Sequence, residues 1–138
     1  MNVFLCYGTA RDQLLAFRLQ VMAAVGGITA FVPWRNPDAA GRKMIQERLK
    51  ATDLVLVLVS SKLGRTAVKF MEGAEKLAKP MLVMDGSSVS YVGGDLRNYI
   101  EARWKDQRDQ DRVRALLLLA SGLVLLDQTA CRRKKVSA

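Results

Sequence analysis

The sequence of 138 residues contains no histidine. Without histidine, the chain cannot form a Ser-His-Asp triad or a Cys-His pair, and it has no histidine general base or metal ligand. Proton transfer near neutral pH is therefore left to carboxylates, to a lysine or cysteine with a shifted pKa, or to groups of the substrate. This absence narrows the chemistry more than any other feature of the composition.

Cysteine is nearly absent as well. The two cysteines, Cys6 and Cys131, lie at opposite ends of the chain, so they form neither a CxxC redox motif nor a zinc cluster. Two isolated cysteines without a signal peptide favour a reducing compartment. We expect a cytoplasmic protein with no metal site and no resident cofactor.

The chain also lacks an apolar run long enough to cross a bilayer, which takes about 20 residues. The longest such run, residues 115–126, is predicted to be a helix that packs on a sheet or at a subunit contact. An interfacial membrane helix fits less well, because the run has no polar face.

Acidic residues are the minority among the charged ones: 22 Lys and Arg outnumber 13 Asp and Glu, for a formal net charge of +9. The excess is spread along the chain, and only Arg132 to Lys135 form a dense run. We expect residues 131–138 to be a basic flexible tail. The alternative is that this tail binds nucleic acid or an anionic membrane surface. However, no interleaved aromatics and no helix-turn-helix or finger pattern support nucleic-acid recognition.

The chain has the length of one domain and a globular balance, with 50% hydrophobic residues. Residues 54–59 are apolar on both faces, which is typical of a central parallel strand covered by helices on both sides. Strand and helix patterns alternate, which predicts an α/β fold: an open parallel sheet of four to five strands in a flavodoxin-like three-layer sandwich. The predicted strands are 3–7, 28–32, 54–59 and 81–84, and the predicted helices are 10–25, 39–51 and 66–78.

The remaining signals are more local. Thr9 and Asp12 resemble a capping box at the start of the first helix. Three-to-four-residue spacing predicts that the apolar stripe of that helix consists of Leu14, Phe17, Val21, Met22 and Val25.

Residues 87–130 are harder to read. They suggest an edge strand at 89–92 and a helix that is capped by Asp95 and reaches Trp104. We assign residues 1–130 to a single domain.

Ligands of open parallel sheets bind beyond the carboxyl ends of the strands, at the point where the strand order reverses. Helix N-termini there can receive phosphate through unpaired backbone amides. No GxGxxG or Walker pattern occurs, so motifs alone indicate neither a dinucleotide site nor a P-loop. The rule selects Tyr7, Gly8, Thr9, Arg11, Trp34, Arg35, Asp38, Ser60, Ser61, Arg65, Thr66, Asp85 and Ser87.

Glu72 and Glu75, on the helix after the central strand, are also candidate functional residues. Helical spacing allows Glu72 to point toward the same cleft rim as Tyr7 and Trp34. The alternative is that both glutamates are solvated and pair with lysines at helical spacing.

Residues 3–83 resemble a bacterial TIR-like (Toll/interleukin-receptor) domain. The opening VFLCYGTARD at 3–12 is similar to that family's VFISYSxxD box, and residues 34–41 stand where the family has its variable BB loop. The most specific match is MIQERLKATDLVLVLVS at 44–60, which is similar to the family pattern xIxxALxxADxVLVLVS. The family's serine, tryptophan and glutamate then fall on Thr66, Val68 and Glu72.

This resemblance implies cleavage of the nicotinamide glycosidic bond of NAD, with NAD as substrate and Glu72 as catalytic residue. Tyr7, Gly8 and Trp34 would line the pocket, and Arg11, Arg35 or Arg65 would meet phosphate. Segment 64–67 is faintly similar to nucleoside 2-deoxyribosyltransferases, which use a glutamate on base–sugar bonds. A carboxylate suits this chemistry, because the transition state is an oxocarbenium-like sugar.

A different class of function remains open. TIR-like domains also act as non-catalytic interaction modules that self-associate or bind a partner protein through the BB loop and neighbouring helices. Two features favour this reading: Val68 stands in place of the family's tryptophan, and residues 115–126 are apolar.

Overall fold

The computed structural model describes residues 1–60, 62–90 and 94–137, and it leaves undescribed the side chains of residues 90 and 129–137. Of the positions considered above, Ser61, Tyr91 and Val92 lie outside this description. So do the side chains of the basic run 132–135.

The centre of the molecule is one five-stranded sheet in the order β2-β1-β3-β4-β5. The first four strands run parallel, and the last is antiparallel to its neighbour. This order confirms the predicted open α/β sheet and is the flavodoxin-like one, with its switch point between the first and third strands. The strands are β1 (Asn2–Tyr7), β2 (Thr29–Phe31), β3 (Leu54–Val59), β4 (Met81–Asp85) and β5 (Ser88–Ser90).

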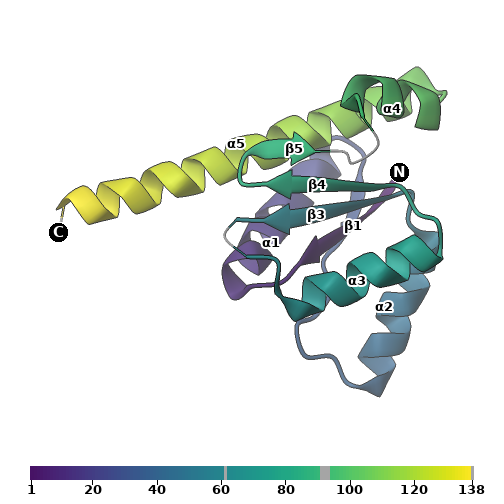
Figure 1. Cartoon of the computed structure of the whole chain (residues 1–138), viewed down its shortest axis with the longest axis horizontal. Coiled ribbons are helices and arrows are strands. Elements are labelled where there is room, and N and C mark those ends of the chain that lie inside the picture. The colour runs from purple at the N-terminus through teal and green to yellow at the C-terminus, as the bar shows by residue number, and fades with distance from the viewer. Residues whose placement is uncertain (61, 91–93, 138) are drawn as a thin grey trace.

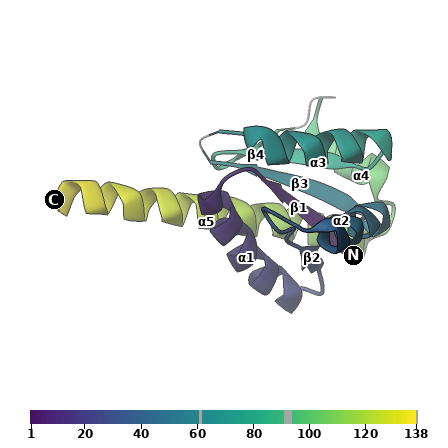
Figure 2. The same ribbon diagram turned by 90° about the horizontal axis from the view of Figure 1, so that it is seen from below.

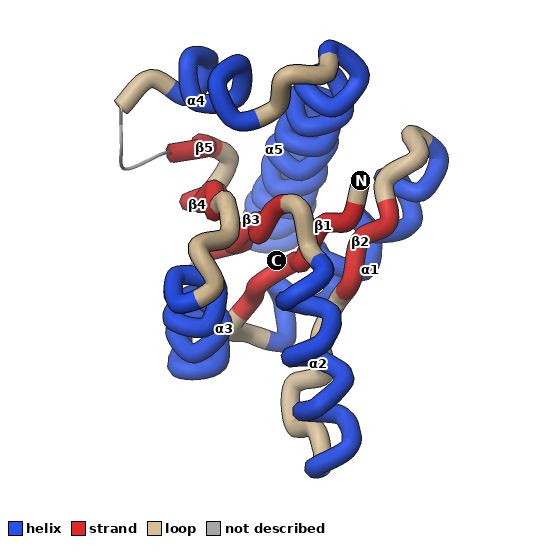
Figure 3. Tube along the Cα trace, turned by 90° about the vertical axis from the view of Figure 1, so that its right-hand side faces the viewer, coloured by secondary structure: helices blue, strands red, loops and turns tan. Residues whose placement is uncertain are grey.

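Helices cover both faces of the sheet, which confirms the three-layer arrangement. The helices lie in two layers, one in front of the sheet and one behind it (Figures 1, 2 and 3). The front layer in Figure 1 holds α2 (Ala39–Ala51) and α3 (Gly64–Lys76). The back layer holds α1 (Ala10–Val25) and α5 (Gln107–Ser137), with α4 (Leu96–Arg103) at one end.

The sheet divides the buried residues into two clusters. Successive side chains of a strand point to opposite faces. Val3, Leu5 and Tyr7 of β1 therefore pack with α1 and α5, and Phe4 and Cys6 pack with α2 and α3. All five residues of β3 from 54 to 58 are buried, as its two-sided apolar run predicts.

The first helix corrects one prediction. The five residues of the predicted apolar stripe are exposed: Val21 by 69% and Val25 by 91%. The buried face instead consists of Leu15, Ala16 and Leu19, together with Asp12 and Ala23. This helix carries apolar residues on two opposite faces, and their spacing alone does not determine which face meets the sheet.

The capping box at the start of α1 is only half formed. The Thr9 hydroxyl accepts a hydrogen bond from the Asp12 amide at 3.1 Å, so Thr9 is the N-cap, as predicted. The Asp12 carboxylate does not return a bond to Thr9. It accepts one from the amide of Ser60 at 3.4 Å instead. At α4, Asp95 caps as predicted, by accepting from the amides of Arg97 and Asn98.

The C-terminal region forms one long helix. Helix α5 unites the polar segment after Lys105 with the apolar run 115–126, and its buried residues lie on the sheet. Residues 131–137, predicted to be a flexible tail, are its helical C-terminal end, which projects beyond the sheet (Figure 1). None of the described helices is long and apolar enough to cross a membrane.

Candidate functional site

The carboxyl edge of the sheet at the switch point is closed by backbone contact. A Cβ atom on Gly8, just after β1, would lie 1.8 Å from the carbonyl oxygen of Leu63. Gly64 follows with a positive φ of 76° and approaches the backbone of Gly8 in turn. Glycine is therefore required at Gly8, where it lets the loops after β1 and β3 meet. This contact brings the loops after β1 and β3 together at the switch point that the strand order predicts.

A buried carboxylate lies beneath this closed edge. Asp12 is fully buried and bonds to the Ser60 amide through Oδ2. Its Oδ1 atom and the Ser60 hydroxyl have no hydrogen-bond partner among the described residues. Neither side chain lines any of the five best-defined pockets of the described residues. The amide of Ser60 thus ties the end of β3 to α1, and Thr9 serves as the N-cap of that helix.

Tyr7 anchors the loop after β2. Its side chain is 1% exposed, and its hydroxyl donates a hydrogen bond to the carbonyl of Pro33. Burial raises the pKa of the Tyr7 phenol to about 12, an effect that the nearby Arg35 charge partly opposes. Tyr7 therefore positions loop 33–38 from beneath.

Loop 33–38 then shapes the entry to α2. Asp38 caps this helix by accepting from the Gly41 amide at 2.7 Å. The Trp34 ring meets Phe31 edge-on at 6.1 Å between centroids, yet 48% of the Trp34 side chain stays exposed. Trp34 is thus held at one edge while part of its surface remains available.

A cavity lies between this loop, α2 and the start of α3. It has a volume of about 420 Å³, within the range of small-molecule sites. Three of the residues selected from the sequence, Trp34, Arg35 and Thr66, line it. We call this cavity the α2/α3 groove; its lining residues are Trp34, Arg35, Asn36, Pro37, Arg42, Ile45, Gln46, Thr66, Lys69 and Phe70.

The α2/α3 groove has the electrostatics of an anion site. Arg35, Arg42 and Lys69 line it, and no acidic residue does. Arg42 also donates a hydrogen bond to the Pro37 carbonyl at 3.2 Å, so its guanidinium is held at the loop. Trp34 and Phe70 add aromatic surface at the same place. Such a groove can take a ligand that combines negative charge with a planar ring.

Glu72 lies outside the groove, on the exposed side of α3. It lines a shallow hollow with Gly64, Arg65, Val68 and Lys69. Lys69 lines both the hollow and the groove, so the two adjoin. Among the described residues, Glu72 and Glu75 form no ion pair. The lysine pairing considered from the sequence does not form.

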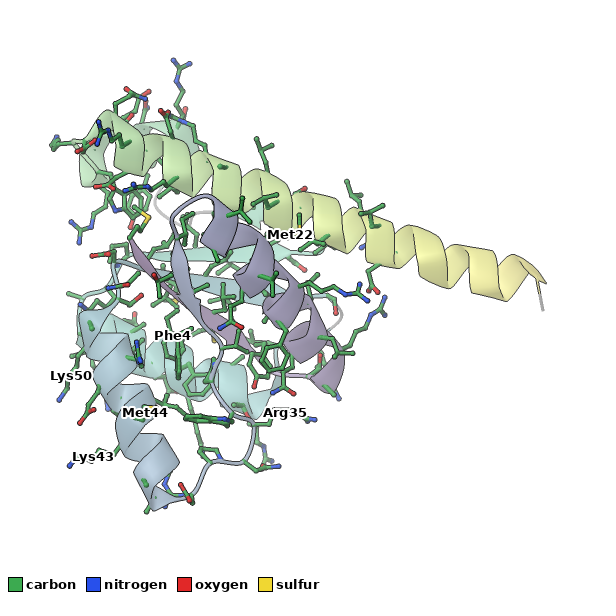
Figure 4. All side chains as sticks on the ribbon, turned by 180° about the vertical axis from the view of Figure 1, so that it is seen from behind. Phe4, Met22, Arg35, Lys43, Met44 and Lys50 are labelled. Atoms are coloured by element: carbon green, nitrogen blue, oxygen red, sulfur yellow. The ribbon has the colours of Figure 1, made fainter. Side chains whose placement is uncertain are left out.

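Arg11 is engaged elsewhere. Its guanidinium pairs with the Asp127 carboxylate of α5, with Nη2 at 2.7 Å and Nε at 2.9 Å. Arg11 therefore ties α1 to α5 on the far side of the sheet, away from the α2/α3 groove, and Thr9 serves as the N-cap of α1. Figure 4 views the molecule from this α1 and α5 side, with Arg35 labelled near α2.

Several lining residues of the groove are not among those predicted from the sequence. Arg42, Gln46 and Phe70 lie within helices, whereas the rule of strand ends selects loop positions. A signal for two of them exists: Arg42 and Gln46 are four residues apart and share one face of α2 with Ile45. Which helix that face meets is not a local property of the sequence.

No group of three or more His, Cys, Asp or Glu side chains is placed to hold a metal ion within the described residues. Comparisons with known proteins assign no family to the chain. No protein-family model matches the sequence, and no curated protein matches it significantly.

Proposed function

We propose that this chain is a TIR-like nucleotide-binding domain that cleaves the N-glycosidic bond of NAD or a related nucleotide. The observation that carries the proposal is the lining of the α2/α3 groove, with three cations, two aromatic rings and no acid. Arginine and lysine recognise phosphate, and an exposed indole can stack on a base.

Glu72 supplies the reactive group in this proposal. It lies one turn beyond Lys69 on α3, in the hollow that adjoins the groove. Phosphates in the groove would place the sugar near Lys69 and the glycosidic bond toward Glu72. The carboxylate there stabilises the oxocarbenium-like sugar as the bond breaks.

The reaction balances without histidine, metal or redox partner. The C–N bond breaks toward the ring nitrogen, so nicotinamide leaves as a neutral base. A water oxygen then bonds to the anomeric carbon and releases its proton to solvent. The substrate class therefore fits the composition of the chain.

Binding is tested by titrating NAD and ADP while recording tryptophan fluorescence. Trp34 is exposed in the groove and Trp104 is 7% exposed, so quenching reports on Trp34. Arg35→Ala and Lys69→Ala should each weaken binding roughly tenfold, as expected for loss of a charge-assisted contact. Lys43→Ala is the matched control, because Lys43 is an exposed cation of α2 outside the groove lining. Equal weakening by the control would argue for non-specific charge attraction.

Cleavage is tested by nicotinamide release from NAD at high protein concentration. Glu72→Gln should abolish release, because the neutral amide cannot stabilise a cationic sugar. Glu75→Gln is the control: Glu75 lies three residues further along α3 and is also exposed. Release that persists in Glu72→Gln would refute the assigned role, whereas intact binding without release by the wild type would reduce the proposal to nucleotide binding.

A non-catalytic interaction module is the second candidate function. The observation that favours it is the apolar outward face of α1 and α5, which lies across the sheet from the groove.

A further inference from the structure

A second cavity adjoins the α2/α3 groove, between the loop before α2 and the first two turns of that helix. It has a volume of about 430 Å³ and is lined by Trp34, Met44 and residues 36–38, 40 and 41. We call it the loop cavity. Residues 34, 36 and 37 line the groove as well, so the two cavities meet along the loop.

The loop cavity, the α2/α3 groove and the hollow beside Glu72 lie in a row. The loop cavity meets the groove at Trp34, and the groove meets the hollow at Lys69. The loop cavity and the hollow have no described lining residue in common. The groove is therefore the middle one of three adjoining sites, and a long ligand that fills it has one end on either side.

The charge of the lining changes sign between the groove and the loop cavity. Three cations and no acid line the groove, whereas Asp38 lines the loop cavity and no cation among the described residues does. The Asp38 carboxylate accepts the Gly41 amide through Oδ1 at 2.7 Å, and an ionised carboxylate can accept further hydrogen bonds. The loop cavity therefore disfavours phosphate and favours a neutral group with N–H donors.

The other side chains of the loop cavity suit a flat ring. Trp34 is 48% exposed and Met44, labelled on α2 in Figure 4, is 44% exposed. Indole and thioether groups both pack favourably against aromatic rings. The Asn36 side chain adds a donor and an acceptor, with which asparagine can bind the amine and the adjacent ring nitrogen of adenine. A planar base that carries an exocyclic amine matches all of these groups.

We propose that the loop cavity is the adenine subsite of a nucleotide whose phosphates occupy the α2/α3 groove. This inference rests on the proposed function and names the base that the site selects. The adenine amine donates one hydrogen bond to Asp38 and one to the side-chain oxygen of Asn36, and the ring lies against Trp34 and Met44. In NAD the adenosine, the phosphates and the nicotinamide riboside follow one another in the order of the three sites that ends at Glu72.

The first test compares three ligands of the full chain by isothermal titration calorimetry: ADP, inosine diphosphate and pyrophosphate. Inosine diphosphate carries an oxygen in place of the adenine amine, and this oxygen would face the Asp38 carboxylate. ADP should therefore bind roughly tenfold more tightly than inosine diphosphate, as expected for one charge-assisted hydrogen bond. Pyrophosphate should bind more weakly than ADP, because it fills the groove alone.

Asp38→Asn tests the role of the carboxylate without removal of the helix cap, because asparagine caps helices as well as aspartate does. The amide nitrogen offers a donor where the carboxylate offered an acceptor. The preference should therefore reverse, so that inosine diphosphate binds at least as tightly as ADP. Glu47→Gln is the control: it removes the same charge from an exposed position of α2 outside both linings. It should leave the ratio of the two affinities unchanged.

Ala40→Leu tests the position of the base. Ala40 is exposed in the first turn of α2 and lines the loop cavity. The larger side chain should weaken ADP binding at least about tenfold, because it occupies the space of the base, and leave pyrophosphate binding unchanged. Ala39→Leu is the matched control, since Ala39 is exposed beside it and does not line the cavity. Circular dichroism checks that each variant folds.

The outcomes separate this inference from the proposed function. Equal affinities of the wild type for ADP and inosine diphosphate overturn the adenine subsite, as does full ADP affinity in Ala40→Leu or tighter binding of GDP than of ADP. Pyrophosphate binding that ADP does not exceed also overturns the subsite, but leaves the phosphate groove in place. A wild type that binds neither pyrophosphate nor ADP overturns the proposed function and the subsite together. Nicotinamide release is not part of this test, so a failure of the Glu72 role leaves its outcomes unaffected.

Discussion

At the scale of single residues, the contact between Gly8 and Leu63 decides the shape of the sheet edge. A Cβ atom 1.8 Å from a backbone oxygen cannot be accommodated without moving the backbone. We predict that Gly8→Ala destabilises the protein by about 3 kcal/mol or more, through strain in two loops at once. The measurement is urea unfolding followed by circular dichroism.

Gly26→Ala is the matched control for this prediction. Gly26 has a φ of −86°, and a Cβ there would meet its nearest neighbour, the Ala23 oxygen, at 3.6 Å. It should change the free energy of unfolding by less than about 1 kcal/mol. Similar losses in both variants would show that the loops after β1 and β3 do not meet as described.

Two buried groups on β1 predict how stability changes at alkaline pH. Burial raises the pKa of the Cys6 thiol from its ordinary 9.0 to about 12, and that of the Tyr7 phenol from 10.0 to about 12. Both groups therefore stay protonated in the folded chain when they already ionise in the unfolded one. Their contribution to the free energy of unfolding is complete below pH 9. The contribution of Cys6 falls from pH 9 and that of Tyr7 from pH 10, and both are lost as the pH rises through about 12.

The check is the free energy of unfolding between pH 8 and pH 11, with Cys6→Ala beside the wild type. Removal of the thiol should make the free energy of unfolding fall less steeply between pH 9 and pH 10, because in the unfolded chain Cys6 ionises at a lower pH than Tyr7. A decline of equal slope in the two proteins would place its origin elsewhere in the chain.

At the scale of elements, α1 shows why local periodicity can choose the wrong face. Leu14 and Leu19 are both leucines of this helix, but Leu14 is 64% exposed and Leu19 is fully buried. We predict that Leu19→Ala costs about 2–5 kcal/mol in the free energy of unfolding, because it leaves a cavity in the core. Leu14→Ala should cost less than about 0.5 kcal/mol in dilute solution.

Urea unfolding of dilute protein measures both variants, so that self-association does not contribute. A loss in Leu14→Ala as large as that in Leu19→Ala would mean that the helix is rotated about its axis. The same comparison tests the outward side of α1, which is apolar only if Leu14 and Val21 point away from the sheet.

At the scale of the whole molecule, the two cores on either side of the sheet raise the question of cooperativity. The chain carries one tryptophan in each layer: Trp104 packs into the core with α1 and α5, and Trp34 lies on the loop before α2. We predict a single unfolding transition, because every residue of β3 from 54 to 58 is buried between both layers.

Two single-tryptophan variants test this prediction. In Trp104→Phe the fluorescence reports on Trp34, and in Trp34→Phe it reports on Trp104. Within each variant, the urea midpoint from fluorescence should coincide with that from circular dichroism. Separate midpoints in either variant would show that one layer unfolds before the other, against the single domain predicted for residues 1–130.

The sequence by itself determined the fold class and the order of the elements. Alternation of apolar runs with helical spacing, and the two-sided apolar run 54–59, suffice for an open parallel sheet because they reflect local periodicity and burial on both faces. Caps at Thr9 and Asp95 were also predictable, since a cap depends on atoms two or three residues away. The rule of strand ends likewise selected Trp34, Arg35 and Thr66, which the structure brings together in the α2/α3 groove.

Tertiary structure alone decided which helix faces are buried, and where the surface is closed or forms a groove. The closure of the switch point depends on Gly8 meeting Leu63, 55 residues further along. The groove depends on α2 and α3 lying side by side, and the outward position of Val21 depends on which face of α1 the sheet takes. These are contacts between segments far apart in the chain. Their outcome is set by the packing of the whole molecule, because propensity and spacing act over only a few residues.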